Sequence, residues 1–138
     1  MKLIMSASRA TLGAIANHER TMGLASVLAH SGAKFKVALG VFEEDNQTVA
    51  TEVSFMVDIS DHSYPNELAA EMAQRLYDDY QQECILLVGY NLKCHLVYPD
   101  DGRLPVRKPE YIGIWTECAT RPAGNATQVD GKWYQAAI

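Results

Sequence analysis

The spacing of apolar side chains changes twice in the first part of the chain. Residues 3–5 form a short apolar run with the length of a strand. Apolar positions then recur every three or four residues over 17–31, which predicts an amphipathic helix. Over 35–41 and 51–57 they alternate with polar or small residues, the period of a β-strand. This part of the sequence therefore predicts the order β-α-β-β, with a polar hairpin loop at 43–47.

The second part of the chain repeats the change from helix to strand. A helix is predicted over 65–80, because apolar residues recur there every four positions and the first turn tolerates a proline. The run at 84–88 is apolar on both faces, which indicates a central strand. Residues 92–98 are its expected hairpin partner. Two further short strands are predicted at 111–116 and 132–136.

The order β-α-β-β-α-β with additional C-terminal strands predicts an α+β fold, a ferredoxin-like sandwich. We expect a single domain over 1–138, with a core at 1–98 and a C-terminal strand extension at 99–138. The two helices would cover one face of the sheet. Because strand 84–88 is apolar on both faces, we expect a partner subunit to cover the other face.

Composition narrows the classes of partner. The chain has 138 residues, 48% hydrophobic and 21% charged, which is ordinary for a globular protein. A net charge of −5 argues against nucleic-acid binding through a basic surface. The three cysteines are widely spaced and no two histidines lie four residues apart, so we expect reduced thiols, no metal site and a cytoplasmic protein. The apolar N-terminal run is too short for a signal peptide or a membrane span, so no membrane association is expected.

Strand alternation places a carboxylate on the second face of the predicted sheet. Glu52 and Ser54 point away from the expected helix side, and Phe42 of the preceding strand shares their face. A carboxylate beside an aromatic ring is suited to a cationic ligand. The alternative is a solvated glutamate on an edge hairpin, the usual position for such a side chain.

A second polar cluster follows the first predicted strand. Ser6, Ser8 and Arg9 lie in the loop, and Asn17 and Arg20 lie on the helix that it enters. Such a loop commonly offers hydroxyl and backbone N–H groups to an anion, for example a carboxylate. Helix capping by serine or asparagine, with solvated arginines, explains the same residues equally well.

Several short segments, taken in order, resemble the phage-encoded S-adenosylmethionine hydrolase/lyase family. The resemblance covers roughly residues 3–98, with a looser similarity near the end of the chain. The segments are Ser6-Ala7-Ser8-Arg9, Asn17-His18-Glu19-Arg20, Gly40-Val41-Phe42 ahead of Glu52, Glu83-Cys84-Ile85-Leu86-Leu87-Val88, Leu96-Val97-Tyr98 and Gly131-Lys132-Trp133-Tyr134-Gln135.

The resemblance implies an enzyme that destroys S-adenosylmethionine in the cytoplasm of an infected bacterium, with no cofactor and with substrate sites between the subunits of a homotrimer. The essential glutamate of the family corresponds to Glu52. The segment from Ser6 to Arg9 would supply polar contacts to the substrate. An aromatic residue about ten positions before the glutamate is tyrosine in relatives and Phe42 here, so this chain lacks the hydroxyl of that tyrosine.

The implied chemistry needs few protein groups, because a sulfonium is already an activated leaving group. The substrate carboxylate can attack its own γ-carbon, which releases S-methyl-5'-thioadenosine and closes L-homoserine lactone. Holding the methionine moiety folded can supply ~7–11 kcal/mol of the barrier. The expected function is therefore a lyase that counteracts host processes dependent on S-adenosylmethionine during phage infection. The alternatives are a hydrolase that forms homoserine directly, with Glu52 as general base, and a non-enzymatic ferredoxin-like ligand-binding or host-inhibitor module.

Overall fold

The structure, a computed structural model, describes residues 1–43 and 49–138. Apart from position 43, the expected hairpin loop at 43–47 lies outside the described residues. The elements are β1 (Lys2–Met5), α1 (Ala14–His30), β2 (Lys34–Glu43), β3 (Val49–Asp58), α2 (Pro65–Tyr80), β4 (Ile85–Val88), β5 (Lys93–Val97), β6 (Glu110–Cys118), β7 (Ala126–Val129) and β8 (Lys132–Ala137).

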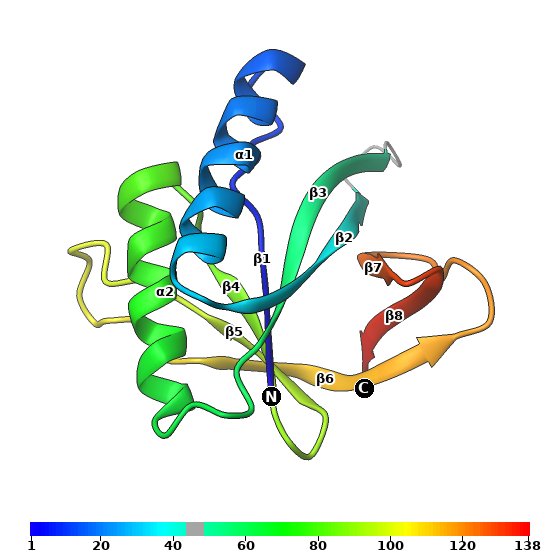
Figure 1. Cartoon of the computed structure of the whole chain (residues 1–138). Coiled ribbons are helices and arrows are strands. Elements are labelled where there is room, and N and C mark those ends of the chain that lie inside the picture. The colour runs from blue at the N-terminus through cyan, green and yellow to red at the C-terminus, as the bar shows by residue number, and fades with distance from the viewer. Residues whose placement is uncertain (44–48) are drawn as a thin grey trace.

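The strands form a closed barrel in the order β1-β3-β2-β7-β8-β6-β5-β4. Every neighbouring pair is antiparallel. Both helices lie on the same outer side of the barrel, as Figure 1 shows. Neither helix within the described residues has the length and apolar character needed to span a membrane.

The predicted ferredoxin-like sandwich is wrong. The strands after β4 are not an extension on one edge of a sheet: β5, β6 and β8 continue the sheet, and β7 pairs with β2 to close it. Closure removes both sheet edges and turns the second face of the sheet into the barrel interior. That face therefore needs no partner subunit to cover it, because Leu86 of β4 packs there against Ile4 and its neighbours.

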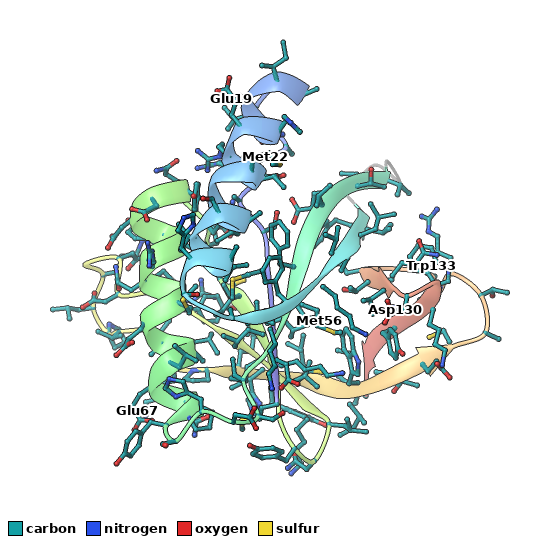
Figure 2. The ribbon with its side chains drawn as sticks, in the orientation of Figure 1. Glu19, Met22, Met56, Glu67, Asp130 and Trp133 are labelled. Carbon is teal, nitrogen blue, oxygen red and sulfur yellow. The ribbon has the colours of Figure 1, made fainter. Side chains whose placement is uncertain are left out.

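Two hydrophobic clusters result from the alternation of side chains along the strands. Leu3 of β1 is fully buried between the barrel and the helices, against Leu24 and Leu76. Ile4, the next residue, lies on the opposite face inside the barrel, with Met56 of β3. Figure 2 shows Met56 among the barrel strands. The interior cluster is completed by Ala38, Val129, Leu86, Trp115 and Tyr134.

The helices cover only part of the outer barrel surface. Phe55 and Val57 of β3 lie in the helix-side core, as the alternation predicts. Val37 of β2 and Val53 of β3, expected on the same covered face, are 64% and 41% exposed. The outer parts of β2 and β3 extend away from the helices (Figure 1), so the prediction is wrong for these two residues.

The ends of the helices direct two loops toward the open end of the barrel. Helix α1 begins three residues earlier than expected, at Ala14, after Gly13 in an extended conformation. Helix α2 has Pro65 in its first turn, as predicted, and ends at Tyr80, and the next residue, Gln81, lies in the left-handed region with φ 55°. The turn at Gln81 reverses the chain, so that residues 82–84 pass beside the barrel opening before β4.

Candidate functional site

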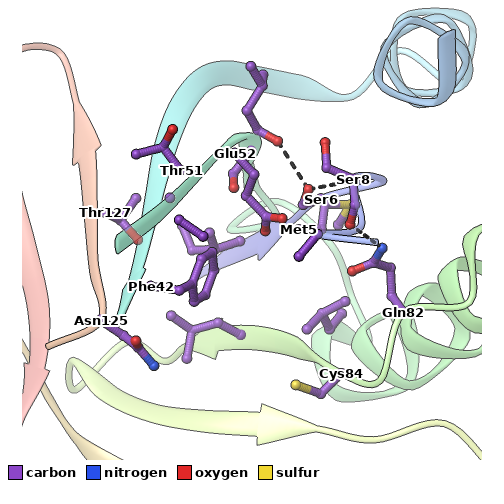
Figure 3. Close-up of a pocket in the computed structure, with 18 of the residues that line it drawn as sticks. Met5, Ser6, Ser8, Phe42, Thr51, Glu52, Gln82, Cys84, Asn125 and Thr127 are labelled. Atoms are coloured by element: carbon purple, nitrogen blue, oxygen red, sulfur yellow. Dashed lines mark hydrogen bonds between the residues drawn. The ribbon is translucent and has the colours of Figure 1, made fainter. Parts of the chain in front are cut away.

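One end of the barrel is hollow. A cavity of about 1050 Å³ lies inside it, which is a size suited to a small-molecule ligand. The barrel strands, the β1–α1 loop, the first turns of α1 and the segment after α2 all contribute to its lining. Trp115 and Tyr134 line it as well; their rings stack with centroids 5.2 Å apart and join the interior core. Figure 3 shows part of this cavity.

The pairing of β2 with β3 places Glu52 in the cavity lining. Glu52 lies opposite Gly40, and Ser54 lies opposite Ala38, so these side chains share the inner face of the barrel. Phe42 lines the same cavity, as Figure 3 shows, and its side chain is partly exposed, at 39%. The predicted cluster of carboxylate, hydroxyl and aromatic ring is therefore present inside one barrel, on the face that we expected a partner subunit to cover.

The cavity alters the electrostatics of Glu52. Burial raises the pKa of the Glu52 carboxyl above its usual value, and the neighbouring Ser6 hydroxyl opposes part of that shift. Within residues 1–43 and 49–138, Glu52 takes part in no ion pair. A partly buried carboxylate without a protein cation is a favourable site for a cationic ligand.

Ser6 and Ser8 lie in the loop after β1, beside Glu52. The Ser6 hydroxyl donates to the backbone carbonyl of Val53 at 3.1 Å and accepts from the backbone N–H of Ser8 at 3.1 Å. Gln82 donates from Nε2 to the Ser8 carbonyl at 2.8 Å, as the dashed lines in Figure 3 show. Both serines are buried and line the cavity, so the loop forms a fixed wall of the site.

Asn17 and Arg9 also line the cavity, and they contact each other. Asn17 Oδ1 accepts from the backbone N–H of Arg9, and Asn17 Nδ2 donates to the Arg9 carbonyl, each at 2.9 Å. The exposed Arg9 side chain donates to the carbonyl of Gln81 at 3.3 Å. Asn17 thus holds the β1–α1 loop against helix α1. This structural role resembles the helix capping that the sequence left open as an alternative to ligand binding.

Arg20 is the one predicted site residue that does not line the cavity. Its Nε donates to the carbonyl of Ala7 at 2.7 Å, and Nη2 donates to the carbonyl of Tyr80. The guanidinium also contacts the Gln81 side chain at 3.1 Å and lies 5.3 Å from the centre of the Tyr80 ring. These contacts join the β1–α1 loop to the end of α2.

Sequence reasoning missed several cavity residues. Thr127 lies on β7, a four-residue strand that the pattern of apolar residues did not reveal. Gln82 and Cys84 follow α2, and burial raises the pKa of the Cys84 thiol. His18 on α1 also lines the cavity. The described residues contain no group of three or more metal-ligating side chains.

Comparison of the sequence with known protein families gives a match. The family model for the S-adenosylmethionine lyase family matches residues 3–137, nearly the whole chain. The match includes β6, β7 and β8, which complete the barrel and its cavity. A search of curated proteins found no match.

Proposed function

Because the chain belongs to the S-adenosylmethionine lyase family and is an enzyme with that activity, we propose that it converts S-adenosylmethionine into S-methyl-5'-thioadenosine and L-homoserine lactone. The observation that supports this proposal is the position of Glu52, partly buried in a cavity of about 1050 Å³ with no ion-pair partner among the described residues. The cavity is large enough for a nucleoside joined to an amino acid.

The proposed reaction needs no proton transfer. An oxygen of the substrate carboxylate forms a bond to the γ-carbon, the bond from that carbon to sulfur breaks, and its electron pair returns to sulfur. The negative carboxylate and the positive sulfonium both lose their charge in this step. Surroundings of low polarity favour such a charge-neutralising transition state, so a dry cavity and a folded substrate supply most of what is required.

The role of Glu52 follows from the same change in charge. A carboxylate that bound the sulfonium most strongly would stabilise the substrate more than the transition state, because the sulfonium charge disappears. The substrate ammonium keeps its charge throughout the reaction. We therefore assign Glu52 to the ammonium, with the Phe42 ring beside the cationic part of the substrate and Ser6, Ser8 and Ser54 as polar contacts.

A hydrolase is the second candidate, and two observations favour it. The raised pKa of Glu52 suits a general base, and His18 lines the same cavity. In that reaction water attacks the γ-carbon and homoserine forms directly. A third possibility, a binding module without turnover, would retain S-adenosylmethionine unchanged.

The reaction in oxygen-18 water, quenched early, distinguishes these candidates. A lyase produces unlabelled lactone first, and later opening of the lactone at its carbonyl places the label in the carboxyl group. A hydrolase produces homoserine labelled at the hydroxyl group, with no transient lactone. Early hydroxyl-labelled homoserine would replace the lyase proposal with the hydrolase. Absence of methylthioadenosine would contradict both.

We also propose that the enzyme acts as a homotrimer in the bacterial cytoplasm during phage infection, where it depletes S-adenosylmethionine. Apolar side chains support self-association near the cavity, since Ile15 of α1 is 79% exposed and Val53, next to Glu52 on β3, is 41% exposed on the outer barrel surface. Expression in bacteria should lower the cellular S-adenosylmethionine concentration and the methylation of host DNA. Unchanged concentrations in cells that contain active enzyme would contradict the biological role.

A further inference from the structure

Three residues form a row across adjacent strands of the barrel wall. Glu52 on β3 pairs with Gly40 on β2, and Gly40 pairs with Thr127 on β7. All three line the cavity. Adjacent strands lie about 4.8 Å apart, so the outer two Cα atoms are separated by about 10 Å. Because the middle residue has no side chain, Glu52 and Thr127 face each other across an open position in the wall.

The open position at Gly40 is closely bordered. A Cβ atom built there would lie 3.1 Å from the Phe42 ring, 3.1 Å from the Ser54 hydroxyl and 3.4 Å from the Glu52 side chain. Glycine therefore lets these three groups approach the same part of the wall. A carboxylate, a hydroxyl and an aromatic ring converge at this position, with the Thr127 side chain on the β7 side.

Two residues at this position that carry hydroxyl groups are largely buried and line the cavity. Ser54 is 3% exposed and Thr127 is 8% exposed. Neither side-chain hydroxyl hydrogen bonds to a residue in the described part of the chain. No side-chain oxygen in the described part of the chain is both fully buried and without a hydrogen-bond partner, so these two hydroxyls are accessible from the cavity and free to bind a polar ligand there.

We propose that Thr127 is a further substrate-binding residue, and that the row Glu52–Gly40–Thr127, with Ser54, holds the ammonium group of the substrate. The inference rests on the proposed function, because it takes S-adenosylmethionine as the ligand. An ammonium has three donors and no acceptor, which matches one carboxylate and two hydroxyls. A sulfonium has no N–H donor and would leave both hydroxyls without a partner.

The test compares three ligands, by calorimetry for the two that the enzyme does not consume and by KM for S-adenosylmethionine. S-adenosylmethionine and S-adenosylhomocysteine both carry the ammonium group, whereas methylthioadenosine lacks it. Thr127→Val keeps the shape of the side chain and removes the hydroxyl. We expect this change to raise the KM of S-adenosylmethionine and the Kd of S-adenosylhomocysteine about 10-fold or more, as for a hydrogen bond to a charged group. The Kd of methylthioadenosine should stay unchanged, and Thr127→Ser should restore most of the lost affinity.

Thr116→Val is the matched control, because Thr116 is exposed on β6 and lies outside the cavity. Wild-type affinity for both ammonium ligands in folded Thr127→Val protein would overturn the inference. An equal loss for all three ligands would also overturn it, since it would indicate a general change of the barrel. Failure of the proposed function would appear differently, as wild-type protein that binds these ligands and releases no methylthioadenosine. Wild-type protein that binds none of the three ligands would contradict both.

Discussion

Glu52 is the residue on which the proposed chemistry depends most. Glu52→Gln keeps the size of the side chain and removes its charge, so the substrate ammonium loses its counter-ion. We expect kcat/KM to fall about 100-fold or more, in line with the loss of a strong charge-assisted hydrogen bond. Steady-state assays of methylthioadenosine release measure this. Activity close to wild type in a folded Glu52→Gln variant would remove Glu52 from the mechanism.

The raised pKa of Glu52 also predicts two effects of pH. Binding of the ammonium requires the ionised carboxylate, so kcat/KM should fall as the pH drops through a value above the usual glutamate pKa. In the folded state the Glu52 carboxyl keeps its proton to a higher pH than in the unfolded state. At pH values above the Glu52 pKa of the unfolded state, ionisation of Glu52 therefore lowers the free energy of unfolding. Glu52→Gln should therefore raise Tm at neutral pH and leave it unchanged below the unfolded pKa. Thermal denaturation at both pH values checks the sign, and an unchanged Tm at neutral pH would contradict it.

The reactivity of the Cys84 thiol provides a second test of whether a ligand occupies the cavity. Burial raises the pKa of this thiol, and a protonated thiol reacts slowly with electrophiles, including a sulfonium. We expect slow alkylation of Cys84 by iodoacetamide at pH 7, faster alkylation at higher pH and protection by bound S-adenosylmethionine. Peptide mass spectrometry can follow Cys84, with Cys118, which lies outside the cavity, as the control. Equal protection of both thiols would indicate a general change on binding instead of occupancy of this cavity.

At the scale of elements, strand β2 shapes the site through its glycine. Gly40→Ala places a methyl group 3.1 Å from both the Phe42 ring and the Ser54 hydroxyl, so these groups must move. We expect KM to rise about 10-fold and stability to fall by about 1–3 kcal/mol. Gly13→Ala is the control for the same chemical change, since a Cβ at Gly13 meets nothing within 4 Å. A wild-type KM for Gly40→Ala would contradict this account of β2.

The connection between the β1–α1 loop and helix α2 depends on Arg20. Arg20→Met removes its hydrogen bonds to Ala7, Tyr80 and Gln81, and we expect the free energy of unfolding to fall by about 1–3 kcal/mol. Arg20→Lys should restore little, because an ammonium cannot span the same acceptors. Arg75→Met, which removes an exposed pair with Asp79, should change stability by less than about 0.5 kcal/mol. Urea denaturation compares the three variants, and equal stability of Arg20→Met and wild type would contradict this role.

The sequence predicts the longer elements well because each carries its own periodic signal. The amphipathic pattern from Pro65 and the alternation around Glu52 are local, and both elements occur in the structure. Strand β7 has only four residues and no apolar alternation, and its partner β2 lies far away in sequence. The pairing of β7 with β2 closes the barrel, so the pattern that predicts the elements does not predict the fold class.

The residues of the candidate site likewise fall into those that local sequence patterns predict and those that only the tertiary fold reveals. Strand alternation predicts that Glu52, Ser54 and Phe42 share a face, and the structure places all three on one cavity. Arg20 lies on α1 beside the β1–α1 loop, but it donates to backbone carbonyls and does not line the cavity, which residue type alone does not reveal. Thr127 was missed because its place in the site exists only through the pairing with Gly40.

At the scale of the whole molecule, the proposed trimer gives a test of assembly. We expect light scattering to give three times the mass of the chain. Ile15→Asp should lower both this mass and the activity, because Ile15 is an apolar side chain, 79% exposed, on the helix beside the cavity. Leu104→Asp is the matched control, since Leu104 is 89% exposed in the segment between β5 and β6. A fully active wild-type monomer would contradict the trimer and would confine the site to one chain.

The pairing of β2 with β7, which closes the barrel, also affects when the protein becomes active during its synthesis. Only three residue pairs join these strands, and one of them, Gly40 with Thr127, lies in the cavity wall. The ribosome synthesises β7 long after β2, and such contacts between distant segments form slowly. The nascent chain therefore cannot complete the cavity, and with it the catalytic activity, until β7 has also been synthesised.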